Sequence, residues 1–360
     1  MNNIERIIEE RKIPGVLDGV KTPEDFQKKR EEIQKLLMNE QFGTIPPKPD
    51  HMYSEVTSID ESFCAGFAPL RHIKLTFELD GETFSFPIAA VIPKSDKKLP
   101  AFVHINFRNA VPDKYMLSEE IADEGFAVFS ICYGDVSSDN GDFKNGIAKN
   151  LVKSRRKGNA PGKIALWAWA AMRVMDYIET LDEIDTENVA VVGHSRLGKT
   201  ALLAGGFDER FKYVISNDSG CCGAAIERGK VGETYKVITD VFPYWFCPSF
   251  VKKAGEGKEF SFDQNYLLAL SVPRTIIIGS AEEDLWADPA SEFLCLASVN
   301  DAYKIYGKQG LVHNDEIPTP VTLLKDGDSC YHIRHGKHYL SRKDWRAYMT
   351  IINERLDKHI

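Results

Sequence analysis

A serine flanked by glycines lies where a valine-rich segment, residues 189–192, meets an Ala- and Leu-rich helical segment that begins at Leu197. Ser195 is the third residue of Gly193-His-Ser-Arg-Leu-Gly198. A serine in a tight strand-to-helix turn is typical of a nucleophile elbow, where the helix N-terminus stabilises developing negative charge. The usual elbow has glycine two residues after the serine, but here that position is leucine and the glycine follows one residue later. The pattern favours acyl transfer by Ser195 over the alternative, a strand–turn–helix with an incidental serine.

A serine nucleophile needs a base to take its proton and an acid to orient the base. In the α/β-hydrolase order the acid follows the nucleophile and the histidine comes last. His338 lies in the loop between the last predicted strand and the last predicted helix, which is where this fold places its base, and His335 is its rival. Asp284 follows the strand that ends at Ser280, and Asp218 follows the preceding strand. Either carboxylate can orient the imidazole, and both keep the order.

An oxyanion hole needs two donors directed at the carbonyl oxygen of the substrate. The backbone N–H of Arg196 is expected to be one of them. The segment 106–109, which follows a predicted strand, has no glycine run to supply the second. We therefore expect the guanidinium of Arg196 to contribute, because a cation at a helix N-terminus opposes the helix dipole and needs a compensating partner.

The elements that position these residues follow from hydrophobic periodicity. Residues 72–79 and 83–92 alternate on either side of Asp80-Gly81, which predicts an antiparallel hairpin. Beyond it, predicted strands alternate with helices, including one at 118–124 with Ser118 as its cap; the strands are 101–107, 126–132, 189–192, 211–216, 274–280 and 330–334. This alternation indicates an α/β protein with a doubly wound sheet. We predict an α/β-hydrolase fold, a three-layer sandwich with a mostly parallel central sheet and an antiparallel leading hairpin.

The chain is predicted to divide near residue 50. Residues 1–50 form a helical extension with a helix start at Thr22-Pro-Glu-Asp25 and a proline-rich linker. Residues 51–360 form the catalytic domain. Within it, 217–272 is too long for a plain crossover and is expected to be an insertion over the carboxyl edge of the sheet, where ligands bind in such folds.

Composition excludes several function classes. The chain is 43% hydrophobic and 27% charged with a formal charge of −8, as in a globular protein that does not bind nucleic acid. No apolar run reaches the length of a membrane span. Seven cysteines without a CxxC pair fit reduced thiols, and the N-terminus lacks a signal-peptide core, so we expect a cytoplasmic protein, or a secreted one if a signal was removed. No metal or cofactor is expected.

The elbow resembles that of the glucuronoyl esterases, carbohydrate esterase family 15, which have Gly-x-Ser-Arg-x-Gly-Lys at this position. The resemblance covers residues 85–355. It includes the segments 106–108, 133–136, 216–225, 242–247, 280–289 and 331–338.

This resemblance implies a serine esterase that cleaves the ester between a glucuronic acid carboxyl and an alcohol, as in lignin–xylan links. It implies that Ser195 is the nucleophile, His338 the base and Arg196 the stabiliser of the oxyanion, with an acid on either of two loops, at Asp218 or Asp284. Three further residues would contact the sugar: Lys199, Glu233 and Trp286. Their alternatives are a solvated helix lysine, an exposed acid and a core tryptophan.

The chain departs from the family in two ways. Members acting on plant walls are typically exported, whereas no signal peptide is visible here. Position 218 is Asp where members often have Glu, so Asp284 is expected to do most of the orienting of the histidine. An acetyl esterase of xylo-oligosaccharides or other small sugar esters would use the same triad. A non-catalytic sugar-binding relative would keep Trp286 and Glu233 without the nucleophile–base pair. A dienelactone-type hydrolase with a cysteine nucleophile is disfavoured by Ser195.

Overall fold

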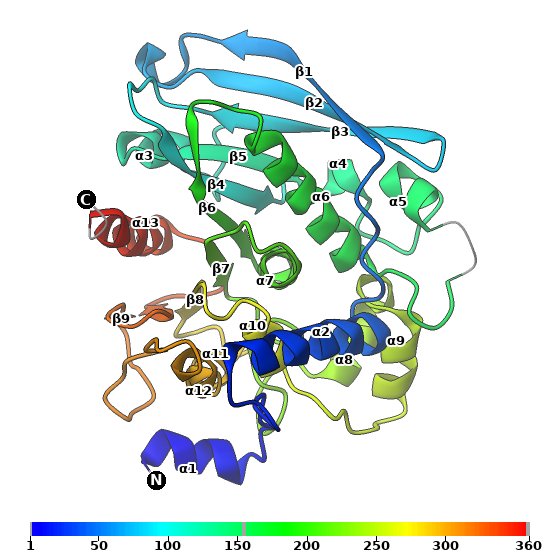
Figure 1. The fold of residues 1–360 in the computed structure, drawn as a ribbon, viewed down its shortest axis with the longest axis vertical. Helices are drawn as coiled ribbons and strands as arrows, with labels where there is room; N and C mark the ends of the chain where they lie inside the picture. Colours follow the sequence, from blue (N-terminus) through cyan, green and yellow to red (C-terminus); the bar gives the residue numbers. More distant parts are fainter. Residues whose placement is uncertain (1, 153–155, 358–360) are drawn as a thin grey trace.

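The computed structural model describes residues 2–152 and 156–357. Ten strands of this described chain form one sheet in the order β1-β2-β3-β5-β4-β6-β7-β8-β10-β9 (Figure 1). Its central strands pair with one another in parallel and are β4 (Leu99–Asn106), β5 (Ala127–Cys132), β6 (Ile184–His194), β7 (Tyr213–Asn217), β8 (Thr275–Ala281) and β10 (Cys330–Arg334). The predicted α/β-hydrolase fold with a mostly parallel sheet is confirmed.

The antiparallel strands lie at the two edges of this sheet. The predicted hairpin is formed by β2 (Leu70–Leu79) and β3 (Glu82–Val91), and Asp80 and Gly81 between them have positive φ angles of 53° and 77°. β1 (His51–Asp60) pairs with β2 at one edge, and β9 (Thr322–Leu324) pairs with β10 at the other. Neither edge strand was predicted as a strand, because β1 is exposed along nearly its whole length and β9 has only three residues.

Helices cover both faces of the sheet because its central strands bury side chains on both faces. In β6, Val189 and Val191 belong to one hydrophobic cluster, whereas Ala190 and Val192 belong to the other. The first cluster includes α6 (Lys163–Ile178) and α7 (Arg196–Phe207). The second includes α3 (Ser118–Asp123) and α13 (Arg342–Asp357) (Figure 1). The result is the predicted three-layer sandwich.

The predicted serine cap of α3 is wrong. The helix begins one residue earlier than expected, so Leu117 is the N-cap and Ser118 occupies the first helical position with a buried hydroxyl. Further short helices between and after the strands are η1 (Phe63–Gly66), α4 (Tyr133–Val136), α5 (Gly146–Leu151), α11 (Pro289–Ala297) and α12 (Asn300–Lys304). Among the described helices, none combines the length and apolar character that crossing a bilayer requires.

The N-terminal extension packs against the same core as the rest of the chain. It contains α1 (Asn3–Glu10) and α2 (Pro23–Glu40), and α2 begins at the predicted capping residue, Thr22, whose side chain accepts a 3.2 Å bond from the Asp25 N–H. Phe26 is fully buried on α2, and its ring meets that of Tyr306 edge to face at 5.9 Å. The boundary predicted near residue 50 stays a prediction.

The segment predicted as an insertion, 217–272, starts at the carboxyl end of β7. It contains α8 (Tyr235–Val241), the turn η2 (Pro243–Trp245), α9 (Pro248–Gly255) and α10 (Asn265–Ala269). α2 contacts α9 and α10, so the extension packs against the insertion (Figure 1).

Replacing Phe26 by Ala will lower the free energy of unfolding by about 3–5 kcal/mol, the usual cost of a buried phenylalanine cavity. Urea unfolding followed by tryptophan fluorescence measures it, and Lys28→Ala, an exposed position on the same helix, is the matched control. A main unfolding transition that Phe26→Ala leaves unchanged would show that the extension unfolds independently.

Candidate active site

Ser195 directly follows β6 and has φ 59° and ψ −127°, a backbone conformation that residues other than glycine rarely adopt. A Cβ on Gly193 would lie 2.1 Å from the Leu197 carbonyl oxygen. A Cβ on Gly198 would lie 2.9 Å from the Ser219 side chain. The close approach therefore occurs at position 198, whereas the Leu197 side chain is buried in the core. This explains why the second glycine is displaced by one residue from the usual elbow pattern.

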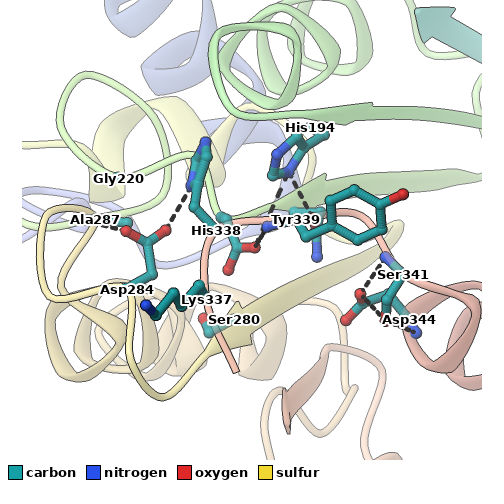
Figure 2. Close-up of polar contacts among 12 residues, drawn as sticks. His194, Gly220, Ser280, Asp284, Ala287, Lys337, His338, Tyr339, Ser341 and Asp344 are labelled. Atoms are coloured by element: carbon teal, nitrogen blue, oxygen red, sulfur yellow. Dashed lines mark hydrogen bonds and ion pairs between the residues drawn. The ribbon is translucent and has the colours of Figure 1, made fainter. Parts of the chain in front are cut away.

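His338 lies in the loop after β10, and its Nδ1 is 2.6 Å from Asp284 Oδ2. The Asp284 side chain is 5% exposed, whereas that of His338 is 44% exposed, so the acid is covered and the imidazole is partly accessible. The His338 ring is 4.4 Å from that of His194, the residue before Ser195 (Figure 2). The structure therefore brings the predicted base to the elbow. Within the described residues, no hydrogen bond joins the Ser195 hydroxyl to the His338 imidazole. Such catalytic bonds commonly tighten only when substrate binds.

His335, the rival base, lies elsewhere. Its Nδ1 is 2.8 Å from Glu282 Oε2, and both side chains are exposed. It therefore makes a surface hydrogen bond with Glu282, whereas His338 is bonded to Asp284.

Asp218, the second predicted acid, is close to the same imidazole but is not bonded to it. One of its carboxylate oxygens lies within 4.8 Å of ligand atoms of both His338 and Asp284. Its Oδ2 accepts bonds from the Tyr339 N–H at 3.3 Å and from Arg334 Nη2 at 3.5 Å. Burial raises the pKa of Asp218 well above its usual value. The sequence offered both acids and favoured Asp284 only through its departure from the family at position 218, and the structure places the hydrogen bond on Asp284.

Asp218, Asp284 and His338 are also, within the described chain, the one group of acidic, histidine or cysteine side chains close enough to hold a metal ion. His338 Nδ1 is already bonded to Asp284, and Asp218 already accepts from two donors. The arrangement therefore fits acid–base chemistry.

Arg196 supplies two kinds of donor at the start of α7. Its backbone N–H has no acceptor within the described residues, as is usual for the first turn of a helix. Its guanidinium forms an ion pair with Asp139, a residue in the loop after α4. In the loop after β4, the Phe107 N–H already donates to Asn106 Oδ1 at 2.8 Å and the Arg108 side chain is paired with Asp113, so both of these donors are already engaged.

The three predicted sugar contacts have different environments. Glu233 and Trp286 lie side by side, since the Glu233 N–H donates to the Trp286 carbonyl at 3.1 Å. The Trp286 side chain is 57% exposed, which excludes the core-tryptophan alternative. Lys199 is buried rather than solvated, and its Nζ donates to the Ser219 carbonyl. The sugar-binding roles of all three stay predictions.

Sequence reasoning missed two acidic residues, Asp139 and Glu292. Glu292 on α11 is fully buried, and its carboxylate accepts the Ser280 Oγ–H at 2.6 Å and the Gly220 N–H at 2.9 Å. It therefore connects the end of β8, which precedes Asp284, to the loop after β7, which contains Asp218. Neither residue has a sequence signal, because each is defined by its distant partners.

Burial raises the pKa of Glu292 from 4.5 to about 7. The folded protein then holds a proton up to about pH 7 that the unfolded chain releases near pH 4.5, so this group lowers the free energy of unfolding as pH rises through that window. Relative to Glu292→Gln, the unsubstituted protein should lose on the order of 3 kcal/mol between pH 4.5 and 8. Chemical denaturation at both pH values tests this, with exposed Glu283→Gln as control. Parallel pH profiles for the protein and Glu292→Gln would refute it.

Comparisons with known proteins identify the family. The sequence model described as fungal glucuronyl esterase matches residues 75–307. The chain is 32% identical to carbohydrate esterase MZ0003 from an unknown prokaryotic organism, over 95% of this chain and 88% of that protein. It is 25% identical to a 4-O-methyl-glucuronoyl methylesterase of Neurospora crassa, over 80% of this chain and 70% of that protein.

Solved structures agree. A glucuronoyl esterase from Solibacter usitatus superposes with a TM-score of 0.88 at 29% identity, covering 95% of this chain and 97% of that chain. A promiscuous esterase of carbohydrate esterase family 15 from a marine bacterial metagenome has a TM-score of 0.84 at 31% identity, covering 95% and 96%. With a serine elbow and an Asp–His pair beside it, this chain belongs to the glucuronoyl esterase family and is a carboxylic ester hydrolase.

Proposed function

We propose that this protein hydrolyses esters of glucuronic acid, including its 4-O-methyl form, through an acyl-enzyme on Ser195. The observation that carries the proposal is the 2.6 Å bond between Asp284 and His338 beside the strained turn that holds Ser195. Backbone strain at the nucleophile is a feature of catalytic serines in this fold. A non-catalytic sugar-binding relative would have no need of either feature.

The reaction follows from the positions of these groups. Ser195 Oγ attacks the ester carbonyl carbon while His338 Nε2 takes the hydroxyl proton, and Asp284 holds the proton on Nδ1 and stabilises the imidazolium. The tetrahedral oxyanion accepts hydrogen bonds from the Arg196 N–H and guanidinium. His338 then protonates the departing alcohol. Water, activated by the same imidazole, attacks the acyl-enzyme and releases the uronic acid.

The surroundings of the elbow support a sugar substrate. The exposed Trp286 ring offers an apolar face, and the neighbouring Glu233 can accept hydrogen bonds from sugar hydroxyls. An ammonium has three donors, so Lys199 can bind a substrate hydroxyl while it donates to the Ser219 carbonyl. The cytoplasmic location expected from the sequence remains part of the proposal.

Acetyl ester hydrolysis is the second candidate, since it would need the same triad. The two are separated by assaying acetylated xylo-oligosaccharides, methyl glucuronate and benzyl glucuronate side by side. We expect the glucuronate esters to have the higher kcat/KM. A higher value for the acetyl esters would favour the second candidate, and no hydrolysis of any ester would overturn both.

Exposure to a fluorophosphonate should label Ser195, and labelling should disappear in His338→Ala because the hydroxyl is no longer activated. Mass spectrometry of the modified peptide locates the adduct. His335→Ala, which removes the exposed rival histidine, is the matched control and should be labelled normally. Active enzyme with an unlabelled Ser195 would exclude it as the nucleophile.

The two acids should contribute unequally. Asp284→Asn should lower kcat by about 10³- to 10⁴-fold, the scale seen when the acid bonded to a catalytic histidine is neutralised. Asp218→Asn should cost less than about tenfold, because burial already favours the neutral carboxyl and a carboxamide is also neutral. Steady-state kinetics of both variants on one glucuronate ester measures the difference, and equal losses would contradict it.

A further inference from the structure

The Arg196 guanidinium is held from several sides. It lies 4.8 Å from the centre of the Trp245 ring, 5.6 Å from that of Phe242 and 5.7 Å from that of Phe107. These distances are in the range of cation–π contacts. The Arg196 side chain is 27% exposed, so it is neither free in solvent nor sealed in the core. Aromatic faces attract a cation but do not fix the direction of its N–H groups.

Asp139 supplies the directional contact. The loop that carries it follows α4, and its side chain is 15% exposed. Its Oδ2 pairs with Arg196 Nη1 and accepts the Tyr133 hydroxyl at 3.1 Å, and its Oδ1 accepts the Trp245 Nε1–H at 2.6 Å. Burial raises the pKa of Tyr133 to about 12, so its hydroxyl remains a donor near neutral pH. Three donors from three segments therefore converge on one carboxylate.

Trp245 couples this arrangement to the insertion. Its side chain is buried, and its ring stacks on Phe242 with centroids 3.9 Å apart and planes 2° apart. Trp245 thus touches Arg196 through its ring and Asp139 through its N–H. The insertion and the loop after α4 hold the same guanidinium from two directions.

We propose that Asp139 is a positioning residue for ester hydrolysis, which fixes the Arg196 guanidinium so that its donors are preorganised for the oxyanion. The inference rests on the proposed reaction at Ser195. A negative charge near a developing oxyanion is unfavourable by itself. The gain is geometric, because a transition-state hydrogen bond requires the donor within a few tenths of an ångström of its ideal position, and a free arginine side chain samples many rotamers.

A double-mutant cycle tests the proposal. Asp139→Asn keeps the shape and one acceptor oxygen for Trp245 but removes the anion that pairs with Arg196. We expect kcat on a glucuronate ester to fall about tenfold with KM changed less than about twofold, while Arg196→Ala costs about 10²- to 10³-fold. Because Asp139 acts only through Arg196, Asp139→Asn should cause no further loss in the Arg196→Ala background.

Two more variants keep the test decisive. Trp245→Phe retains an aromatic ring but removes the N–H donor to Asp139, so it should give a smaller loss of kcat that also vanishes in the Arg196→Ala background. Asp142→Asn, the same substitution in the same loop, should behave as the unsubstituted protein, because among the described residues its carboxylate accepts hydrogen bonds only from its own loop, from the Lys144 N–H and the Asn145 Nδ2. Thermal unfolding of each variant separates lost positioning from lost folding.

The outcomes distinguish this inference from the proposed function. Losses that multiply in the double variant, an Asp139→Asn variant with unchanged kcat, or an Arg196→Ala variant with unchanged kcat would each overturn the positioning role and leave the esterase proposal standing. A protein that hydrolyses no ester and is not labelled at Ser195 by a fluorophosphonate would overturn both.

Discussion

The turn at Ser195 connects the innermost part of the sheet to the helix behind it, and most of the site is arranged around that connection. A non-glycine residue in such a conformation costs of order 1–3 kcal/mol and persists only where the surroundings hold it. Here β6 is paired on both sides, with β4 and β7, and α7 is buried along almost its whole length. Gly193 and Gly198 remove the two side chains that would block the close approach.

The loops that carry the acids and the base are joined beneath the site by buried polar groups. Arg334, at the end of β10, donates to Asp344 at 2.8 Å and lies 3.5 Å from Asp218. Asp344 also accepts from Ser341 in the loop that follows His338 (Figure 2). Glu292 accepts hydrogen bonds from Ser280 at the end of β8 and from Gly220 in the loop after β7. Because an isolated buried charge is costly, these groups must stay paired, and their pairing restricts where Asp284 and His338 can lie.

The oxyanion side of the site depends on a different set of contacts. Arg196 opposes the dipole of its own helix, and Asp139 together with three aromatic rings compensates for this. Part of that support comes from the insertion through Trp245. The segment that the sequence predicts to cover the sheet edge therefore also helps to position the Arg196 guanidinium.

The sequence alone was sufficient for the fold class and for the elbow, because alternation, helical period and glycine spacing are local properties of the chain. It also placed His338 and both candidate acids, since the order of strands in an α/β sheet determines which loops meet at the carboxyl edge. It did not reveal β1, whose exposed residues follow no core pattern.

Only the tertiary structure showed that His338 is bonded to Asp284 and not to Asp218, and that Lys199 is buried. It also identified Asp139 and Glu292. Asp139 is 57 residues from Arg196 in the chain, and Glu292 is 72 from Gly220. Which of two nearby carboxylates meets an imidazole depends on distances of an ångström or two, and those distances are set by packing across the sheet rather than by any local pattern.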